Sequence, residues 1–465
     1  MSEHDEADQT AARLQARLAE VWNVPVAVQG LRRLSGGASR HTWSLEAGPV
    51  GGTPQPLILR CDPPARPRPE LMALERAALT AAASVRVPVP RVVDHGDGQS
   101  GGEAALGQAY LLMERVDGET IPRRLLRDER FAAVRPKLAR EFGRILARIH
   151  SIPREAVPGL PDGDPLEQLT AMYRALDEPR PAIELGLRRL AENRPPARPA
   201  AVVHGDFRNG NLMVNQDGVR AVLDWELVHL SDPIEDLGWL CVKAWRFGSA
   251  DPVGGFGPRD ELLEGYAEVA GIRPSDDELH WWEVFGTVRW AVICRKQAER
   301  YLSGADRSVE FAVLGRRVCE QEHDILLSLG ATGPGAVPDV LAGWEETEPA
   351  APHDRPGAGA LLQAVHGFLT EEVAAGSDAR LRFLARVAAN AVAIARREAL
   401  LGPGHDQVHQ ARLAVLGCAD DRELAEAIRD GSLDGRWEEA VDTVRRSIID
   451  KLAVANPDYA VQPAG

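Results

Sequence analysis

Apolar positions up to about residue 116 predict strands together with two helices, and helical spacing dominates after them. Leu14, Leu18 and Val21 are spaced as on one helix face, so a short amphipathic helix is predicted at residues 11–22. The other elements predicted in this part are a buried strand, a helix and two strand-like runs, at residues 56–60, 69–83, 85–93 and 110–116.

Helices dominate the pattern from residue 136 onward. Apolar residues between Leu138 and Ile149 recur with a 3.6-residue period. Further helices are predicted at residues 233–246, 276–301 and 308–329. A small strand-rich part followed by a larger helical part favours two lobes of an α+β domain over an alternating βαβ array. The predicted boundaries are an N-terminal helix at 1–22, a first lobe at 23–116 and a second lobe at 117–330.

The C-terminal part begins with a stretch whose composition is that of a linker. Residues 331–358 contain several prolines and glycines and an acidic run, which predicts extended or irregular chain. Residues 359–455 then show helical periodicity, and four or five helices of an all-helical accessory domain are predicted. Its apolar positions include Phe368, Leu381, Leu384, Val387, Val392 and Ile394. We expect few contacts between this domain and the rest, and a role in oligomerisation, partner docking or covering the cleft.

Composition narrows the class of partner. The 465 residues are 44% apolar and 26% charged, which is ordinary for a globular protein. A net charge of −15 disfavours binding to nucleic acid or to an anionic membrane surface. No run of about 18 apolar residues occurs, so no membrane span is expected. Five scattered cysteines without a Cys-x-x-Cys pair, and an acidic N-terminus unlike a signal peptide, are typical of a reduced cytoplasmic protein.

The most informative polar run is HGDFRNGN at residues 204–211, followed by VLDWE at 222–226. Phosphoryl transfer needs a carboxylate that orients and deprotonates the accepting hydroxyl, and oxygen ligands that hold Mg²⁺ against the nucleotide phosphates. The spacing of His204, Asp206 and Asn211 is that of the protein-kinase catalytic loop. An Asp-Asn pair alone would more often be a turn device, but the joint pattern favours phosphoryl transfer.

These motifs, over roughly residues 20–330, resemble the aminoglycoside phosphotransferase and choline kinase-like superfamily of small-molecule kinases. Gly205 stands where protein kinases have Arg, Asp224 is followed by Trp-Glu rather than by Phe-Gly, and no A-P-E element follows. The DP and DLGW stretches at 232–233 and 236–239 resemble the branch fused to acyl-CoA-dehydrogenase-like domains. The resemblance implies a two-lobed protein-kinase-like fold, with an antiparallel sheet plus helix in the N-lobe and a mainly helical C-lobe.

The resemblance also implies roles for individual residues. Asp206 would be the catalytic base, Asn211 and Asp224 would hold Mg²⁺, and His204 would buttress the loop. The residues implied in nucleotide binding are Gly36, Gly37 and Ser39 in the phosphate loop, Arg60, its partner Glu75, and the hinge residues Glu114 and Val116. Arg60 departs from the usual Lys, but it still offers a positive charge and a fork for phosphates.

The expected function is ATP- and Mg²⁺-dependent phosphorylation of a hydroxyl on a small molecule. An antibiotic amino sugar, a hydroxyacyl thioester, a choline-like alcohol, homoserine and a sugar all stay open as acceptors, as does ATP against GTP. The alternative is a non-catalytic nucleotide-binding module that recruits a partner through its helical domain, for which Arg60 is the only support. A protein kinase is disfavoured by the missing D-F-G and A-P-E motifs.

Other polar patterns are better explained structurally. Residues 96–101 match G-x-G-x-x-G, but a strand-like run follows, so we predict a loop between two strands. His405 and His409 are four apart without a third metal ligand nearby. Asp232 and Asp236 are expected to cap or brace a helix.

Overall fold

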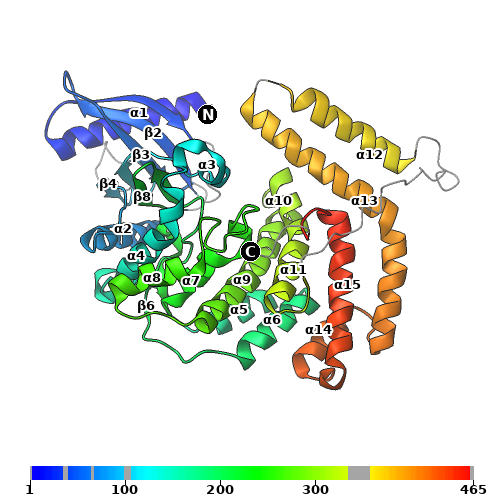
Figure 1. Cartoon of the computed structure of the whole chain (residues 1–465). Coiled ribbons are helices and arrows are strands. Elements are labelled where there is room, and N and C mark those ends of the chain that lie inside the picture. The colour runs from blue at the N-terminus through cyan, green and yellow to red at the C-terminus, as the bar shows by residue number, and fades with distance from the viewer. Residues whose placement is uncertain are drawn as a thin grey trace. The chain divides into compact units, whose positions relative to one another are not determined.

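The computed structural model describes residues 3–34, 40–63, 67–98, 106–333, 357–376 and 378–460, and Figure 1 shows the whole chain. The chain divides into two compact units. Unit 1 comprises residues 1–163, 197–241 and 251–275, and unit 2 comprises 164–196, 242–250 and 276–465. The predicted fold class is confirmed, since an antiparallel sheet comes first, a mainly helical part follows, and a further all-helical region comes last.

Unit 1 starts with a five-stranded antiparallel sheet in the order β1-β2-β3-β5-β4. Its strands are β1 (Val26–Arg33), β2 (His41–Pro49), β3 (Gln55–Cys61), β4 (Val92–Gly96) and β5 (Tyr110–Glu114). Alternation along β3 buries Leu57 and Leu59 in a core shared with Leu14 of helix α1 (Glu3–Trp22), and places Arg60 on the other face. The N-terminal helix therefore packs on the first-lobe sheet, and it starts at Glu3 rather than at residue 11.

The strand predicted at residues 85–93 is wrong for most of its length. Helix α2 (Pro69–Ser84) is capped by Val85, whose N–H donates to the carbonyl of Ala82, and β4 begins only at Val92. Pro88 and Pro90 lie between them, and a proline has no N–H to give to a strand ladder. The predicted strands at 56–60 and 110–116 and the helix at 69–83 are confirmed in position.

Short strands and helices in the rest of unit 1 carry the polar motifs. They are β6 (Ala201–Val203), β7 (Leu212–Asn215), β8 (Gly218–Val222), β9 (His229–Ser231), α3 (Pro122–Arg127), α4 (Leu138–His150), α7 (Ile234–Cys241) and α8 (Arg259–Ala270). β6 pairs with β9 and β7 pairs with β8, both antiparallel. The helix predicted at 233–246 thus ends at Cys241, and a short 3-10 turn follows at Lys243–Trp245 in unit 2.

The described residues of unit 2 form helices joined by turns and irregular connections, without a β-strand. Its α-helices are α5 (Pro165–Arg174), α6 (Pro181–Glu192), α9 (Asp276–Leu302), α10 (Val309–Leu314), α11 (Val318–Ser328), α12 (Ala358–Gly367), α13 (Ala379–Leu416), α14 (Asp421–Asp430) and α15 (Trp437–Ala455). The helix predicted at 276–301 is confirmed, whereas the one predicted at 308–329 is divided by a 3-10 turn at Gly315–Arg317. No helix within the described ranges is long and apolar enough to cross a membrane.

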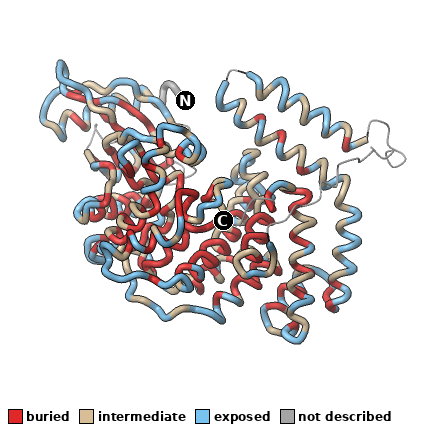
Figure 2. Tube along the Cα trace, viewed as in Figure 1, coloured by how far each residue is buried: buried red, intermediate tan, exposed pale blue. Residues whose placement is uncertain are grey.

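The C-terminal helices share a hydrophobic core with α6 and α11. Figure 2 colours the buried residues of these helices red. Leu424 of α14 and Leu452 of α15 belong to the same buried cluster as Leu185 and Leu326. The expectation that few contacts join this region to the preceding helices is therefore wrong. The predicted domain boundaries stay a prediction, and residues 334–356 of the predicted linker lie outside the described residues.

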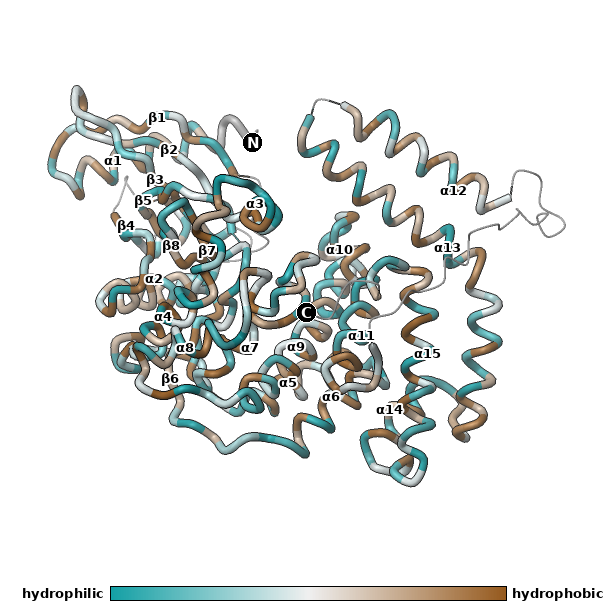
Figure 3. Tube along the Cα trace, viewed as in Figure 1, coloured by the Kyte–Doolittle hydropathy of each residue, from teal (hydrophilic) through white to brown (hydrophobic). Residues whose placement is uncertain are grey.

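The apolar positions predicted for the accessory domain are only partly core. Ile394 is buried, but Phe368 and Leu381 are each 52% exposed. Figure 3 shows apolar residues along α12 and the first half of α13, whereas the shared core uses the end of α13, α14 and α15. Helical periodicity marks an apolar face but does not say which face finds a partner.

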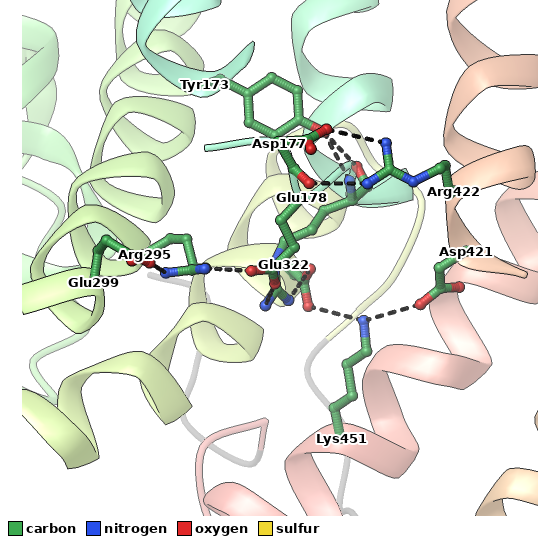
Figure 4. A network of polar contacts seen from close by, with 10 residues as sticks. Tyr173, Asp177, Glu178, Arg295, Glu299, Glu322, Asp421, Arg422 and Lys451 are labelled. Atoms are coloured by element: carbon green, nitrogen blue, oxygen red, sulfur yellow. Dashed lines mark hydrogen bonds and ion pairs between the residues drawn. The ribbon is translucent and has the colours of Figure 1, made fainter. Parts of the chain in front are cut away.

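A polar network also joins α14 and α15 to the helices before them (Figure 4). The carboxylate of Glu322, fully buried on α11, accepts hydrogen bonds from Arg180 at 3.1 Å and from Lys451 of α15 at 3.4 Å. Burial acts to raise the pKa of Glu322, but the positive charges of Lys451 and Arg180 outweigh it and lower the pKa. Loss of the contact with Lys451 would leave the buried carboxylate of Glu322 with fewer compensating cations, which costs free energy. The network therefore ties the C-terminal region to α11.

Candidate active site

The HGD run leaves β6 through a residue that must be glycine. Gly205 has φ +78, in the left-handed region that side chains disfavour. A Cβ at this position would also collide with the carbonyl oxygen of Leu227. The arginine that protein kinases carry here would not fit this backbone.

The carboxylate of Asp206 is held by three donors. Its Oδ1 accepts hydrogen bonds from Trp239 Nε1 and from Arg208 Nε, both at 2.9 Å. Its Oδ2 accepts one from Asn211 Nδ2 at 2.6 Å. The side chain is 14% exposed, so the carboxylate is fixed in orientation yet not sealed from solvent. A positioned, accessible carboxylate of this kind can orient a hydroxyl and accept its proton.

His204 has the geometry of a buttress. Its ring is fully buried, and the backbone N–H of Asp206 donates to Nδ1 at 3.1 Å. Nε2 lies 3.0 Å from the carbonyl of Leu223 and donates to it. Burial lowers the pKa of His204, which agrees with a neutral ring that carries one N–H and one lone pair. His204 therefore links the loop of Asp206 to the residue before Asp224.

Arg60 lies between two carboxylates of unit 1. Its guanidinium contacts Glu75 of α2 and donates to Asp224 Oδ1 at 3.0 Å. Asp224 follows β8 with φ +64, an uncommon conformation for a residue with a side chain, and it is 37% exposed. The structure thus brings together Arg60, Glu75 and Asp224 from three separate elements.

The sequence interpretation missed Arg40. This guanidinium is 4% exposed and pairs with Glu75 and, at 3.3 Å, with Asp62. Burial and the nearby charge of Arg60 both lower the pKa of Arg40. Its Nη2 is buried and has no hydrogen-bond partner among the described residues. The sequence feature that could have pointed to Arg40 is its position directly after the glycine-rich run.

These groups fit a nucleotide and a hard metal ion. An orphaned buried guanidinium nitrogen suits a phosphate oxygen, and two arginines gather in this region. Asn211 uses its amide nitrogen on Asp206, which leaves its oxygen free to act as a ligand, and Asp224 adds a carboxylate. Oxygen ligands of this type suit Mg²⁺.

The roles of the other predicted nucleotide residues stay predictions. Gly36, Gly37 and Ser39 lie outside the described residues, between the paired strands β1 and β2. Glu114 ends β5, and its side chain lies 3.5 Å from Arg91. Val116 follows that strand, whose Leu111 is paired with Arg60 on β3.

Asp236 is the second residue whose role was missed. This fully buried carboxylate accepts hydrogen bonds from the backbone N–H groups of His204 at 2.8 Å and Gly205 at 2.9 Å. His150 Nε2 lies 3.1 Å from the same carboxylate. Burial acts to raise the pKa of Asp236, but the hydrogen bond and charge of His150 outweigh it and lower the pKa. Asp236 thus braces the loop of Asp206, whereas Asp232 caps α7 by accepting from Ile234 N–H.

The remaining motifs have structural surroundings. Gly96 ends β4 and residues 97–98 begin the connection to β5, which agrees with a loop between two strands, and residues 99–101 lie outside the described residues. His409 contacts Ser447 and Asp421 on two neighbouring helices, at 2.9 and 3.1 Å.

Two family models match this chain. Residues 30–281 match the phosphotransferase enzyme family, and residues 375–459 match a domain of unknown function. Among solved structures, a candidate aminoglycoside phosphotransferase from Ralstonia eutropha has TM-score 0.50 and 22% identity, and covers 68% of this chain and 97% of its own. The GDP complex of a mutant aminoglycoside 2'-phosphotransferase-IIIa also has TM-score 0.50, with 14% identity, over 70% of this chain and 99% of that one. These likenesses concern the fold.

Curated relatives carry the name acyl-CoA dehydrogenase family member. Member 10 of Mus musculus is 28% identical over 274 residues, which is 53% of this chain and 25% of the mouse protein. Member 11 of Gallus gallus is 27% identical over 331 residues, 64% of this chain and 40% of the chicken protein. This chain therefore spans well under half of the relatives that it matches.

Proposed function

Because this chain belongs to the phosphotransferase enzyme family, we propose that it transfers the γ-phosphoryl group of ATP to a hydroxyl of a small molecule in a Mg²⁺-dependent reaction. The observation that carries the proposal is the carboxylate of Asp206, held by Trp239, Arg208 and Asn211. A group fixed by three donors keeps one orientation, which favours attack in line with the phosphorus.

Each residue of the site has a part in this reaction. Asp206 orients the acceptor hydroxyl and takes its proton. Arg60 and Arg40 offset the negative charge of the phosphates, while Glu75 keeps both guanidinium groups in place. Asn211 and Asp224 would hold Mg²⁺, which when bound neutralises charge on the phosphate oxygens. The non-catalytic alternative rests on Arg60 in place of the usual Lys, and the contacts of Arg60 with Glu75 and Asp224 support a phosphate-binding role for this arginine.

The acceptor is proposed to be a hydroxyl on an acyl thioester. Support comes from the names of the curated relatives, which place matching sequence in acyl-CoA dehydrogenase family members. Aminoglycosides are the competing acceptor class, supported by the names of the two structures with the same fold.

The test is a screen of acceptors for ADP release with ATP and Mg²⁺. Hydroxyacyl-CoA esters of several chain lengths, aminoglycosides, choline and homoserine form the panel, and mass spectrometry locates the new phosphate. The matching acyl-CoA without the hydroxyl is the control. The proposal expects ADP release only with a hydroxyl-bearing acceptor, and release without any acceptor dependence contradicts it.

A further inference from the structure

A cavity of about 350 Å³ in unit 1 is lined by residues from the start of β6, the end of α4 and helix α8. Figure 1 labels these three elements. Its volume falls in the range of small-molecule sites, roughly 300–1,000 Å³. Part of the lining is apolar and includes Ile152, Pro233 and Ile272. None of the lining residues belongs to the proposed phosphate site.

The charged side chains that line this cavity, called here the basic cavity, are two arginines, and the carboxylate of Asp232 beside them accepts a hydrogen bond from the backbone N–H of Arg198 at 3.3 Å. Arg154 and Arg198 line it, and no aspartate or glutamate is among its lining residues. Arg154 is exposed and has no ion-pair partner within the described part of the chain. Burial raises the pKa of Tyr266, the positive charge of Arg198 acts in the opposite direction, and the negative charges of Asp232 and Asp236 add to the rise. Two guanidinium groups beside an apolar wall select an anion that also carries an apolar portion.

The same cavity touches the residues that brace the catalytic loop. His150 and Tyr266 both line it, and His150 Nδ1 lies 3.1 Å from the hydroxyl of Tyr266. The other ring nitrogen of His150 contacts Asp236, which binds the N–H groups of His204 and Gly205. An occupant of the cavity would therefore pack against the outer end of a hydrogen-bonded chain that ends next to Asp206.

We propose that the basic cavity binds a small organic anion, a carboxylate or a phosphate monoester with a short apolar body, and that the bound anion steadies the loop of Asp206. The anionic group pairs with Arg154 and Arg198, and the apolar body lies against Ile152 and Ile272. Immobilising His150 and Tyr266 limits local opening at Asp236, so the amides of His204 and Gly205 open less often. The binding of this anion does not depend on the proposed function. Only the effect of the bound anion on turnover rests on the proposed function.

Calorimetric titration of the full chain without nucleotide tests the binding. Benzoate and phenyl phosphate are the probes, and benzyl alcohol is the uncharged analogue. We expect either anion to bind at least about tenfold more tightly than the alcohol, and Arg154→Ala or Arg198→Ala to weaken it about tenfold, as loss of one charge-assisted hydrogen bond does. Arg220→Ala, an exposed arginine on β8, is the matched control and should leave binding unchanged.

Two results would overturn the proposal. One is binding that is equal for benzyl alcohol or that survives the Arg154→Ala/Arg198→Ala double variant. The other is binding abolished by Arg60→Ala, since the probe would then occupy the phosphate site. Preference for phosphate over carboxylate, or the reverse, supports the site and identifies its anionic group.

Hydrogen exchange tests the effect on the loop without any turnover. Saturating benzoate or phenyl phosphate, whichever binds, should slow exchange at the amides of His204 and Gly205 in the wild type and not in the Arg154→Ala/Arg198→Ala double variant. Unchanged exchange in the saturated wild type would contradict the coupling. Neither the calorimetric titration nor the hydrogen exchange requires turnover, so both tests stay valid if the acceptor screen fails for lack of the right acceptor.

Discussion

Replacing Asp236 by Asn should weaken the fold locally and slow turnover, although Asp236 is not placed to touch a substrate. The carboxylate accepts from three donors, the amides of His204 and Gly205 and the ring of His150. Asn keeps one oxygen and presents an NH₂ group in place of the other, so at least one buried donor loses its acceptor. An orphaned buried donor costs about 1–3 kcal/mol, so we expect a loss of about 2 kcal/mol in the free energy of unfolding.

Turnover should fall further than this stability loss explains. The two amides belong to the turn that carries Asp206, and a shift of about 1 Å in a catalytic group can cost about 10²-fold in rate. Urea unfolding gives the free energy, and kcat with a hydroxyl acceptor at saturating ATP gives the rate. Asp232→Asn is the matched control just before the same helix, because Asn caps a helix as well as Asp does. A folded Asp236→Asn protein with wild-type kcat would refute the bracing role.

The stability difference between wild type and Asp236→Asn should depend on pH in a defined direction. The pKa of Asp236 is lowered in the folded state, so its contribution is present above the ordinary aspartate pKa and is lost as the pH falls through the lower folded value. We expect the difference to stay constant between about pH 6 and 8 and to shrink below about pH 4. A difference that grows on acidification would mean that Asp236 is not the stabilised anion.

Three further predictions concern the phosphate site and the C-terminal helices. Arg60→Ala should raise KM for ATP and lower kcat, while Arg60→Lys keeps substantial activity because Glu75 can pair with either cation; wild-type kinetics for the alanine variant would assign the role to another residue. Asp224→Ala should abolish Mg²⁺-dependent turnover, and full activity in EDTA or stimulation by Zn²⁺ alone would contradict the metal assignment. A chain that ends at Gly330 should unfold at a lower temperature than the wild type or fail to fold, because it exposes Leu185 and Leu326. If both proteins had the same midpoint temperature of thermal unfolding, the shared core would be dispensable.

The sequence was sufficient to identify candidate site residues that lie close together along the chain. His204, Asp206 and Asn211 lie within eight residues of one another, so their spacing indicated one common loop, and the structure adds the hydrogen bonds that join His204 and Asn211 to Asp206. Asp236 escaped this reasoning because its partner His150 is 86 positions away, and no local pattern distinguishes a brace from a cap.

The fold class followed from periodicity, but packing partners did not. The apolar run at residues 56–60 predicted β3 as a buried strand, and the structure shows that its successive residues alternate between a buried and a partly exposed face. Apolar spacing is present along all of α13, yet Leu413 is in the core shared with α6 and α11 while Leu381 is half-exposed. The choice depends on contacts distant in sequence, which periodicity cannot specify.

The central claim is that the Asp206 carboxylate serves as the base in phosphoryl transfer, and Asp206→Asn tests it most directly. The comparison measures kcat with a hydroxyl acceptor and the Kd for Mg²⁺-ATP, with the exposed Asp217→Asn in the β7–β8 turn as the matched control. We predict that kcat of Asp206→Asn falls by about 10²–10⁴-fold, while its Kd for Mg²⁺-ATP and the kcat of Asp217→Asn stay close to wild type. Near-normal kcat in a folded Asp206→Asn protein would contradict the account.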